Sequence, residues 1–184
     1  TFDVSATNKS GTSPTSSRSA AVRVFGKPYA VGTVTATPGD RQATLSFSAP
    51  NYNGKTITSY NYRVNGGSWA TVPSNRVIGG LTNGTAYRFE VRACNDYCGD
   101  ASSPSSAVTP FGQLAAPSVS TSKPAGNVVR FSWSAPGSNG RGVSHTQISV
   151  NGGGWSNVSA SGSWDSPAGF NKSYTISVRS VDNG

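Results

Sequence analysis

The side chains of this chain that could do chemistry are few and lie far apart. His145 is the only histidine among 184 residues, and no cysteine or carboxylate stands near it in the sequence. Glu90 is the only glutamate, and it stands between Arg88 and Arg92, which is typical of ion pairing between neighbouring strands. General acid–base catalysis needs titratable groups held together in one cleft. The spacing therefore provides no candidate catalytic site.

The two cysteines, Cys94 and Cys98, are only four positions apart. A zinc site needs about four ligands, and the only histidine, His145, is far along the chain. A disulfide would close a small loop and stabilise the fold by about 2 kcal/mol in the chain-entropy account, and two free thiols are the alternative. We predict the disulfide. Asp96 and Asp100 lie in the same segment, where we expect them to form turns.

The composition favours many short strands joined by tight turns. Hydrophobic residues make up 34% of the chain and charged residues 12%, while 22 Gly and 11 Pro supply turn positions. Helix-forming residues such as leucine are scarce, which excludes a helical bundle. The sequence contains no Gly-x-Ser-x-Gly elbow beside a base and no phosphate-binding glycine loop. We therefore predict a protein that is not an enzyme and that carries no cofactor or metal.

The charge is strongly positive, with 15 Lys and Arg against 7 Asp and Glu and a net charge of +8. Such a surface attracts anionic partners, among them cell-wall polymers and other anionic polymers or glycans. The basic residues are spaced singly along the chain, which argues against specific nucleic-acid binding. No apolar run approaches the ~18 residues of a membrane-spanning helix, so we predict no membrane span in this segment.

Hydrophobic and polar residues alternate in several short runs. In Ala43–Ser48, Tyr60–Asn65 and Tyr87–Ala93 every second residue is apolar or aromatic. This period predicts antiparallel strands with one face buried and one face in water. Asn-Gly and Pro-Gly turns separate the runs. About seven such strands fit into one repeat of the chain, which favours a sandwich of two sheets.

The chain repeats itself at an offset of 86 residues. Ala43–Pro50 matches Val129–Pro136, and Val64–Trp69 matches Val150–Trp155. The dipeptide Phe-Gly also recurs, at positions 25 and 111. A further strand pattern recurs at an offset of 87 residues in three copies, namely Phe2–Ala6, Phe89–Ala93 and Ile176–Ser180. The chain is therefore predicted to span just over two repeats.

The repeat unit resembles a fibronectin type III module. Ala43–Ser48 resembles strand B of that family and Ile57–Val64 its strand C, with Trp69 at the start of strand C′. Leu81 followed by Tyr87–Asn95 resembles its tyrosine corner and strand F. The resemblance implies an all-β fold of tandem seven-stranded antiparallel β-sandwiches. It assigns strands F and G of a preceding module to residues 1–28, a complete module to residues 29–113, and a module without its last strand to residues 114–184.

The two copies are expected to bury equivalent large residues. Phe47 and Trp133 take the same position in strand B, and Phe89 and Ile176 face them from strand F. The last copy departs from the family pattern at its corner, where an alanine replaces the leucine and one residue is inserted before the tyrosine. We expect Phe170 or Trp164 to fill the space there.

Trp69 and Trp155 are the candidate ligand-binding residues. Each follows an Asn-Gly-Gly turn, and a partly exposed indole can stack on the CH-rich face of a sugar ring. The alternative is that each indole covers the open side of the sheet formed by strands C and C′. The recurrence of the tryptophan at 86 residues fits this second interpretation.

We predict a secreted or surface-displayed array of such modules that acts as a spacer, stalk or adhesive filament, with neighbouring modules as partners. The linkers at residues 25–28 and 111–114 are short, which favours a semi-rigid rod. A disulfide is typical of extracytoplasmic proteins, and the composition resembles that of bacterial members of the family. The alternative is a set of accessory modules, in contact with sugars, in a secreted polysaccharide-degrading enzyme. A hydrolase domain in the same gene would favour this alternative.

Both ends of the chain fall inside repeats, and the chain has no methionine. We expect strands A to E to precede Thr1 and a strand resembling Ala107–Gly112 to follow Gly184. The alternative is a polymer in which the F–G pair of one molecule completes the open module of the next. Two F strands would then compete for one place, which argues against this alternative.

Overall fold

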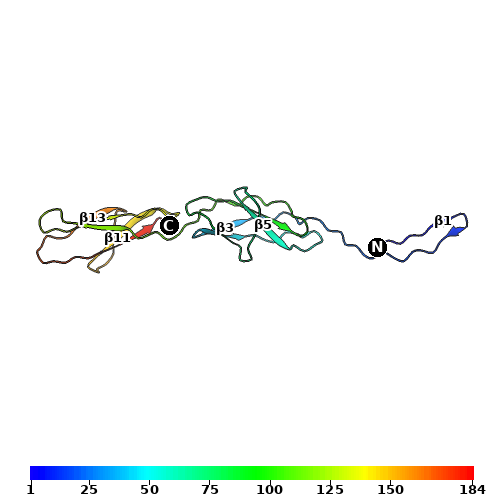
Figure 1. Ribbon diagram of the computed structural model, residues 1–184, viewed down its shortest axis with the longest axis horizontal. Helices are drawn as coiled ribbons and strands as arrows, with labels where there is room; N and C mark the ends of the chain where they lie inside the picture. The colour runs from blue at the N-terminus through cyan, green and yellow to red at the C-terminus, as the bar shows by residue number, and fades with distance from the viewer.

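The structure is a computed structural model that describes all residues from Thr1 to Gly184. It is elongated, with a narrow ribbon at one end followed by two sandwich units that lie in line along the long axis (Figure 1). We call these parts the ribbon (residues 1–24), the central module (residues 29–113) and the C-terminal module (residues 114–184). All assigned elements are strands, and every strand pair is antiparallel.

The strands are short, as the frequent turn residues predicted. The ribbon contains β1 (Thr7–Asn8) and β2 (Gly11–Thr12). The central module contains β3 (Thr35–Gly39), β4 (Gln42–Ser46), β5 (Ser59–Val64), β6 (Ala70–Thr71), β7 (Val77–Gly79) and β8 (Phe89–Cys94). The C-terminal module contains β9 (Ser118–Ser122), β10 (Arg130–Ser134), β11 (Val143–Val150), β12 (Ser156–Val158), β13 (Gly162–Asp165) and β14 (Ile176–Asp182).

Each module consists of two three-stranded sheets with the same strand order. In the central module the sheets are β3-β4-β7 and β6-β5-β8, and in the C-terminal module they are β9-β10-β13 and β12-β11-β14. Asn65 and Gly66 both have positive φ, 48° and 74°, in the turn between β5 and β6. The mirror-image turns of hairpins require this conformation, and Asn-Gly is the dipeptide that adopts it most readily.

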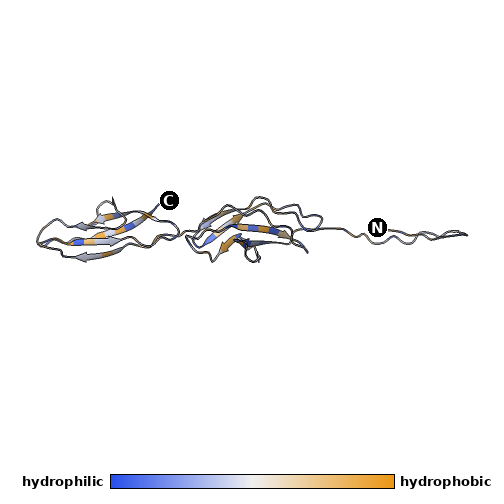
Figure 2. Ribbon diagram, turned by 90° about the horizontal axis from the view of Figure 1, so that it is seen from above, coloured by the Kyte–Doolittle hydropathy of each residue, from blue (hydrophilic) through white to orange (hydrophobic).

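The core of the central module lies between its two sheets. Along β8 the residues Phe89, Val91 and Ala93 are all 0% exposed, while the residues between them are half-buried. From the opposite sheet β4 contributes Leu45 and, just past its end, Phe47, which are 2% and 7% exposed. Figure 2 shows this alternation of hydrophobic and hydrophilic residues along the strands of both modules. The period of two in the sequence therefore identified the buried face correctly.

The C-terminal module has a less fully buried core. Trp133 is 5% exposed, in the position expected from Phe47, but Ile176 on β14 is only half-buried. Of the two residues expected to fill the corner, Trp164 does so, because its ring packs 6.0 Å from that of Phe131. Phe170 instead lies in solvent and is 79% exposed.

The segment expected to form a regular strand G does not do so, and this corrects the sequence-based assignment of Ala107–Gly112. Residues 107–112 make only one isolated bridge, between Val108 and Tyr87. Between β8 and that bridge, the chain pairs with β8 through serines spaced three residues apart. The amide of Ser102 donates to the carbonyl of Val91 at 2.9 Å, and the amide of Val91 donates to Ser102 Oγ at 3.0 Å.

In each of these contacts the serine Oγ accepts the hydrogen bond that a backbone carbonyl would accept in a regular strand pair. Ser105 forms the same two bonds with Phe89, at 2.8 and 3.0 Å. The serine hydroxyl then donates to the carbonyl of the next residue, so its own hydrogen is also used. The ribbon repeats the arrangement with Ser13, Ser16 and Ser19. A segment with serine at every third position can therefore satisfy a neighbouring strand without adopting regular β structure.

The ribbon has the strand pairing of a module but no sheet behind it. Phe2 and Val4 take the positions of Phe89 and Val91 in the repeat, yet they are 82% and 69% exposed. Its two halves are held together by the serine bonds and by the short β1–β2 pair. The ribbon therefore shares its serine bonds with β8 and the segment that follows β8.

Replacing Phe47 with alanine should lower the free energy of unfolding of the central module by about 3–5 kcal/mol. The ring is buried, lies 5.1 Å from that of Tyr60 and is covered by the guanidinium group of Arg76. Replacing the exposed Ser46 with alanine should cost less than about 0.5 kcal/mol. Urea unfolding followed by the amide NMR signals of the central module measures both changes. Equal losses would contradict the assignment of the inward and outward faces of β4.

Candidate functional site at the module joints

The carboxylates singled out in the sequence are held in ion pairs. Glu90 on β8 accepts two hydrogen bonds from Arg63 on β5, at 2.7 and 2.8 Å, and these bonds raise the pKa of Arg63 above its ordinary value. Asp96 and Asp100 each pair with a lysine. The ring of His145 has one hydrogen bond, to the serine before it. No three histidine, cysteine or acidic residues come together as metal ligands would.

Cys94 and Cys98 form a disulfide with an S–S distance of 2.03 Å. The loop that it closes faces the linker between the ribbon and the central module. Within this loop Asn95 donates a hydrogen bond to the carbonyl of Gly26 at 3.0 Å, and the ring of Tyr97 lies 6.2 Å from that of the linker phenylalanine. The disulfide therefore shapes a loop that contacts the linker.

Trp69 lies on the outer face of sheet β6-β5-β8 with two cations over its ring. The guanidinium carbon of Arg92 is 4.3 Å from the ring centroid, and that of Arg63 is 4.9 Å away. Trp155 has one such neighbour, Arg179, at 4.3 Å, and is 42% exposed. Cation–π contacts of this kind stabilise a sheet surface. Trp155 therefore keeps the more accessible indole of the two.

A groove of about 840 Å³ runs along the central module between residues 30–38 and residues 101–109. Its walls consist of Ala, Val, Gly, Thr, Ser and Pro, with no ionisable side chain. The groove lies between the edge of β3 and the serine-bonded segment that follows β8. It therefore offers hydroxyl and backbone groups, and nothing in it could act as a general acid or base.

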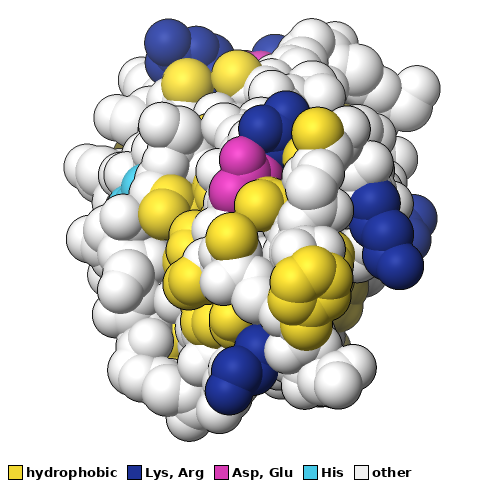
Figure 3. Space-filling model, turned by 90° about the vertical axis from the view of Figure 1, so that its left-hand side faces the viewer, with side chains coloured by type: hydrophobic (Ala, Val, Ile, Leu, Met, Phe, Trp, Pro, Cys, Tyr) yellow, Lys and Arg dark blue, Asp and Glu magenta, His cyan; other side chains and the backbone are white.

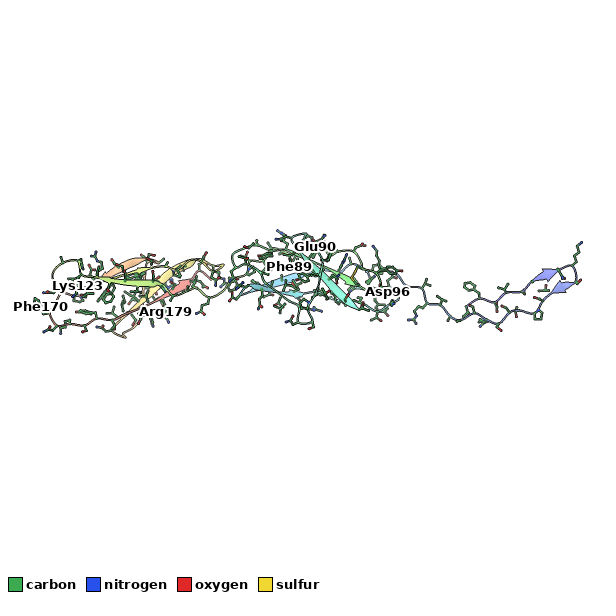
Figure 4. All side chains as sticks on the ribbon, viewed as in Figure 1. Phe89, Glu90, Asp96, Lys123, Phe170 and Arg179 are labelled. Carbon is green, nitrogen blue, oxygen red and sulfur yellow. A yellow bond between two sulfur atoms is a disulfide. The ribbon has the colours of Figure 1, made fainter.

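The joint between the ribbon and the central module is fixed by hydrogen bonds to an Asn-Gly turn. The amide of Gly26 donates to the carbonyl of Asn53 at 3.0 Å, and the Asn53 side chain donates to the carbonyl of Lys27 at 3.2 Å. Lys55 lies over the ring of Phe25, with its Nζ 4.7 Å from the centroid. Figure 4 places the labelled residue Asp96, the ion-pair partner of Lys55, at the same end of the module.

The joint between the two modules repeats these contacts 86 residues later. The amide of Gly112 donates to the carbonyl of Asn139 at 2.9 Å, and the Asn139 side chain donates to the carbonyl of Gln113 at 3.0 Å. Arg141 lies over the ring of Phe111, with its guanidinium carbon 3.6 Å from the centroid. Each joint thus consists of a Phe-Gly linker seated on the Asn-Gly turn and the basic residue of the following module.

The joint between the modules has a second layer from the loops of the central module. The side chain of Asn83 donates to Asn139 Oδ1 at 2.6 Å and to Asp40 Oδ1 at 2.7 Å. Its own oxygen accepts a hydrogen bond from the amide of Arg41 at 2.8 Å. Every polar atom of this amide is therefore used. Asn83 connects the end of one module to the start of the next.

Gly140 is the residue that allows the two modules to approach. Its φ is +90°, a conformation that favours glycine, and a Cβ at this position would collide with the carbonyl oxygen of Pro110 and with Phe111. Gly54 at the other joint has φ +89° and lies against the linker in the same way. The glycine of each Asn-Gly turn is therefore required by close backbone approach as well as by its turn.

The far end of the C-terminal module has a different surface. Figure 3 shows hydrophobic side chains in the middle of this end face, with lysine and arginine side chains spaced around them. Phe170 stands where the repeat places Asn83, and Figure 4 shows Phe170 and Lys123 at this tip. This end therefore lacks the side-chain amide that connects the central module to its neighbour.

The sequence predicted that the Asn-Gly pairs form turns and that the Phe-Gly pairs lie in linkers. It did not predict that each linker is hydrogen-bonded to one of these turns. The signal was present, because the Phe-Gly pairs at 25 and 111 and the Asn-Gly pairs at 53 and 139 recur at the same offset of 86 residues, and a basic residue follows each of these two Asn-Gly pairs. Asn83 gave no such signal, since its partners Asp40 and Asn139 are distant in sequence and the next copy has Phe170 there.

The fold belongs to the class of antiparallel β-sandwich modules. Residues 29–109 match the family model of the fibronectin type III domain, so this part of the chain has the fibronectin type III fold. No helix in the structure could span a membrane.

Among solved structures, the chain is similar to the FN1–FN3 domains of chicken CNTN1, with 16% sequence identity and a TM-score of 0.41. The alignment covers 83% of this chain and 61% of that chain. A likeness as distant as this carries no argument about function. No curated protein matches the chain.

Protein isolated without reductant should have no free thiols, because Cys94 and Cys98 are bonded. Its intact mass should lie two hydrogen masses below that of the reduced chain, and alkylating reagents should add nothing before reduction. Two alkylated cysteines in freshly secreted protein would contradict the prediction. Reduction should loosen the contacts of Asn95 with the linker and leave the core of the central module folded.

Replacing Gly140 with alanine should loosen the joint between the modules. The left-handed conformation alone costs a non-glycine residue about 1–2 kcal/mol, and the new Cβ would displace the linker backbone. Small-angle scattering should show a shorter maximum dimension and a more flexible particle. The matched control is Gly154→Ala, because no atom lies within contact distance of a Cβ there. An unchanged scattering curve for G140A would show that the joint does not depend on this close approach.

Proposed function

We propose that this chain is part of a secreted or surface-displayed array of tandem fibronectin type III modules, which acts as a non-catalytic spacer, stalk or adhesive filament. The observation that supports this proposal is the repeated joint. Two successive connections use the same contacts between a Phe-Gly linker and an Asn-Gly turn. A chain that repeats one joint geometry holds its modules in a fixed order and direction.

The joint leaves the linker little freedom. The amide of Gly112 and the carbonyl of Gln113 are both hydrogen-bonded to Asn139, so the backbone is fixed on both sides of one peptide plane. A flexible linker would instead leave these groups to water, and the modules would move independently. A linker held in this way accounts for the elongated arrangement in Figure 1, and a spacer requires such an arrangement.

The proposed partners are the neighbouring modules and, at the surface, anionic polymers such as those of a cell wall. The net charge of +8 supports attraction to such polymers, and its singly spaced basic residues fit a diffuse attraction better than a specific site. The disulfide supports an extracytoplasmic location, because such bonds persist in oxidising compartments.

A second candidate is an accessory role in a polysaccharide-degrading enzyme, with direct sugar contact. Trp155 favours it, because 42% of its surface is exposed beside the cation of Arg179. Glycan-array binding that is lost in Trp155→Ala and kept in Trp69→Ala would support this role. No binding by the unmodified chain would remove it.

Spin labels at Ser103→Cys and Ser163→Cys test the proposed spacer role, since both positions are exposed and lie in different modules. Pulsed electron paramagnetic resonance should give one narrow distance distribution between the labels, with the native disulfide intact. Adding Asn139→Ala should broaden that distribution severalfold, because three hydrogen bonds across the joint are lost or weakened. A broad distribution in the chain without the joint substitution would refute a semi-rigid rod.

A further inference from the structure

A smaller cavity of the central module lies beside the loop between β6 and β7. It has a volume of about 340 Å³ and opens between this loop, the neighbouring residues of β5 and β6, and the residue that follows β4. Ligand pockets in proteins have volumes of about 300–1,000 Å³, so there is room for one sugar residue here. We call this cavity the Arg76 pocket, and its lining includes Phe47, Ser59, Tyr60, Thr71, Ser74 and Arg76.

The pocket combines an aromatic wall with one fixed cation. The rings of Phe47 and Tyr60 lie 5.1 Å apart at an angle of 56°. The guanidinium carbon of Arg76 is 4.2 Å from the centroid of the Phe47 ring, and its Nη1 donates to the carbonyl of Phe47 at 2.9 Å. A guanidinium group has five N–H donors, and Arg76 forms no ion pair. The group is therefore held in place with donors left for an anion.

Arg76 is held there in an unfavourable backbone conformation. Its φ is +58°, a region in which residues other than glycine are uncommon. Its amide donates to the carbonyl of Pro73 at 2.8 Å, and its carbonyl accepts from the amide of Leu45 at 2.9 Å. A glycine would adopt this conformation with less strain. Strained residues of this kind cluster at ligand sites, which favours a role for the arginine side chain.

The rest of the lining is uncharged and rich in hydroxyl groups. Four aliphatic hydroxyl groups line the pocket, and only that of Thr58 has a hydrogen-bond partner in the chain, the carbonyl of Cys94. Those of Ser59, Thr71 and Ser74 are left for a ligand or for water. Aromatic faces, free hydroxyl groups and one cation together match a sugar that carries a carboxylate.

The C-terminal module fills the corresponding space with a side chain of its own. Trp133 takes the position of Phe47 in the repeat, and its Nε1 donates to the carbonyl of Ser159 at 3.1 Å. In the register of β10 and β13 it lies opposite Gly162, and a Cβ there would be 3.0 Å from the indole. The register of β4 and β7, continued by one pair of strand residues and the next, places Ser74 opposite Phe47. The indole therefore covers the segment that borders the pocket in the central module.

We propose that the Arg76 pocket binds one hexuronate residue of an acidic polysaccharide. The carboxylate pairs with the guanidinium group of Arg76, whose planar fork suits it. The CH-rich face of the sugar packs on the aromatic wall, and the sugar hydroxyls bond to those of the lining. The pocket is separate from the joints and from Trp155, so its failure would leave both the spacer role and the sugar contact of the other module untouched.

The test titrates methyl glucuronoside, a single hexuronate sugar, into the whole chain and follows the amide signals by NMR. The amides of Ser59, Thr71 and Arg76 should shift with saturation, at a dissociation constant of about millimolar for a ligand of this size. Methyl glucoside, which has the same ring without the carboxylate, should bind at least about tenfold more weakly.

Two variants test the arginine and the cavity separately. Arg76→Gly should weaken binding at least about tenfold, and its backbone conformation suits glycine. The matched control is Arg41→Gly, because Arg41 has the same charge and a φ of +55° but lies in the turn between β3 and β4. Phe47→Trp with Ser74→Gly reproduces the arrangement of Trp133 and Gly162 and should abolish the saturable shifts. The amide spectrum of each variant shows whether the central module is folded.

Several outcomes would overturn the proposal. An absence of saturable shifts at the pocket amides would do so, as would equal binding of methyl glucoside. A loss of affinity in Arg41→Gly as large as that in Arg76→Gly would show that net charge alone attracts the sugar. Unchanged binding by the double variant would place the sugar outside the pocket. Tighter binding of N-acetylphenylalanine, which has a ring and a carboxylate but no hydroxyl group besides, would overturn the assignment to a sugar.

Discussion

The backbone amides and carbonyls of β8 need hydrogen-bond partners on both edges of the strand, because its inward side chains are fully buried. Much of the structure of the central module follows from this constraint. An amide left without an acceptor in such a place costs about 1–3 kcal/mol. On one edge β5 supplies regular ladder bonds along six residue pairs. On the other edge Ser102 and Ser105 supply the acceptors for Val91 and Phe89. Strand β8, which ends at the disulfide-bonded Cys94, is therefore held from both sides.

The serine bonds also determine the shape of the sheet edge beside β8. Two residues between successive serines turn away from β8, so the outer side of this segment does not present a regular row of amides and carbonyls. Ser103 and Pro104 occupy one such outward pair. A strand edge that is irregular and carries proline is a poor template for edge-to-edge aggregation. The ribbon, in which Ser16 and Ser19 form the same bonds, has the same irregular pairing.

The sequence predicted well what depends on local alternation and predicted less well what depends on distant contacts. The period of two placed Phe47 and Trp133 in the cores, where they are 7% and 5% exposed. The period of two does not describe the segment after β8, because pairing there follows every third residue. Serines at positions 16 and 19 recur at 102 and 105 and carried that signal. The joints escaped prediction for a different reason: the linker and the Asn-Gly turn that holds it are separated by a whole strand pair.

The contacts across the joint and those within the modules differ in strength, which determines how the chain responds to load. Three hydrogen bonds involving Asn139 cross the joint, and at about 0.5–1.5 kcal/mol each they contribute a few kcal/mol in total. The core of the central module is a cluster of eleven buried residues, and truncating one of its aromatic residues costs about as much as the whole joint. Bending at a joint therefore precedes unfolding of a module.

The two joints also differ, because Asn95 of the disulfide loop supports the first and Asn83 supports the second. Reduction of the disulfide would therefore soften the first joint and leave the second unchanged.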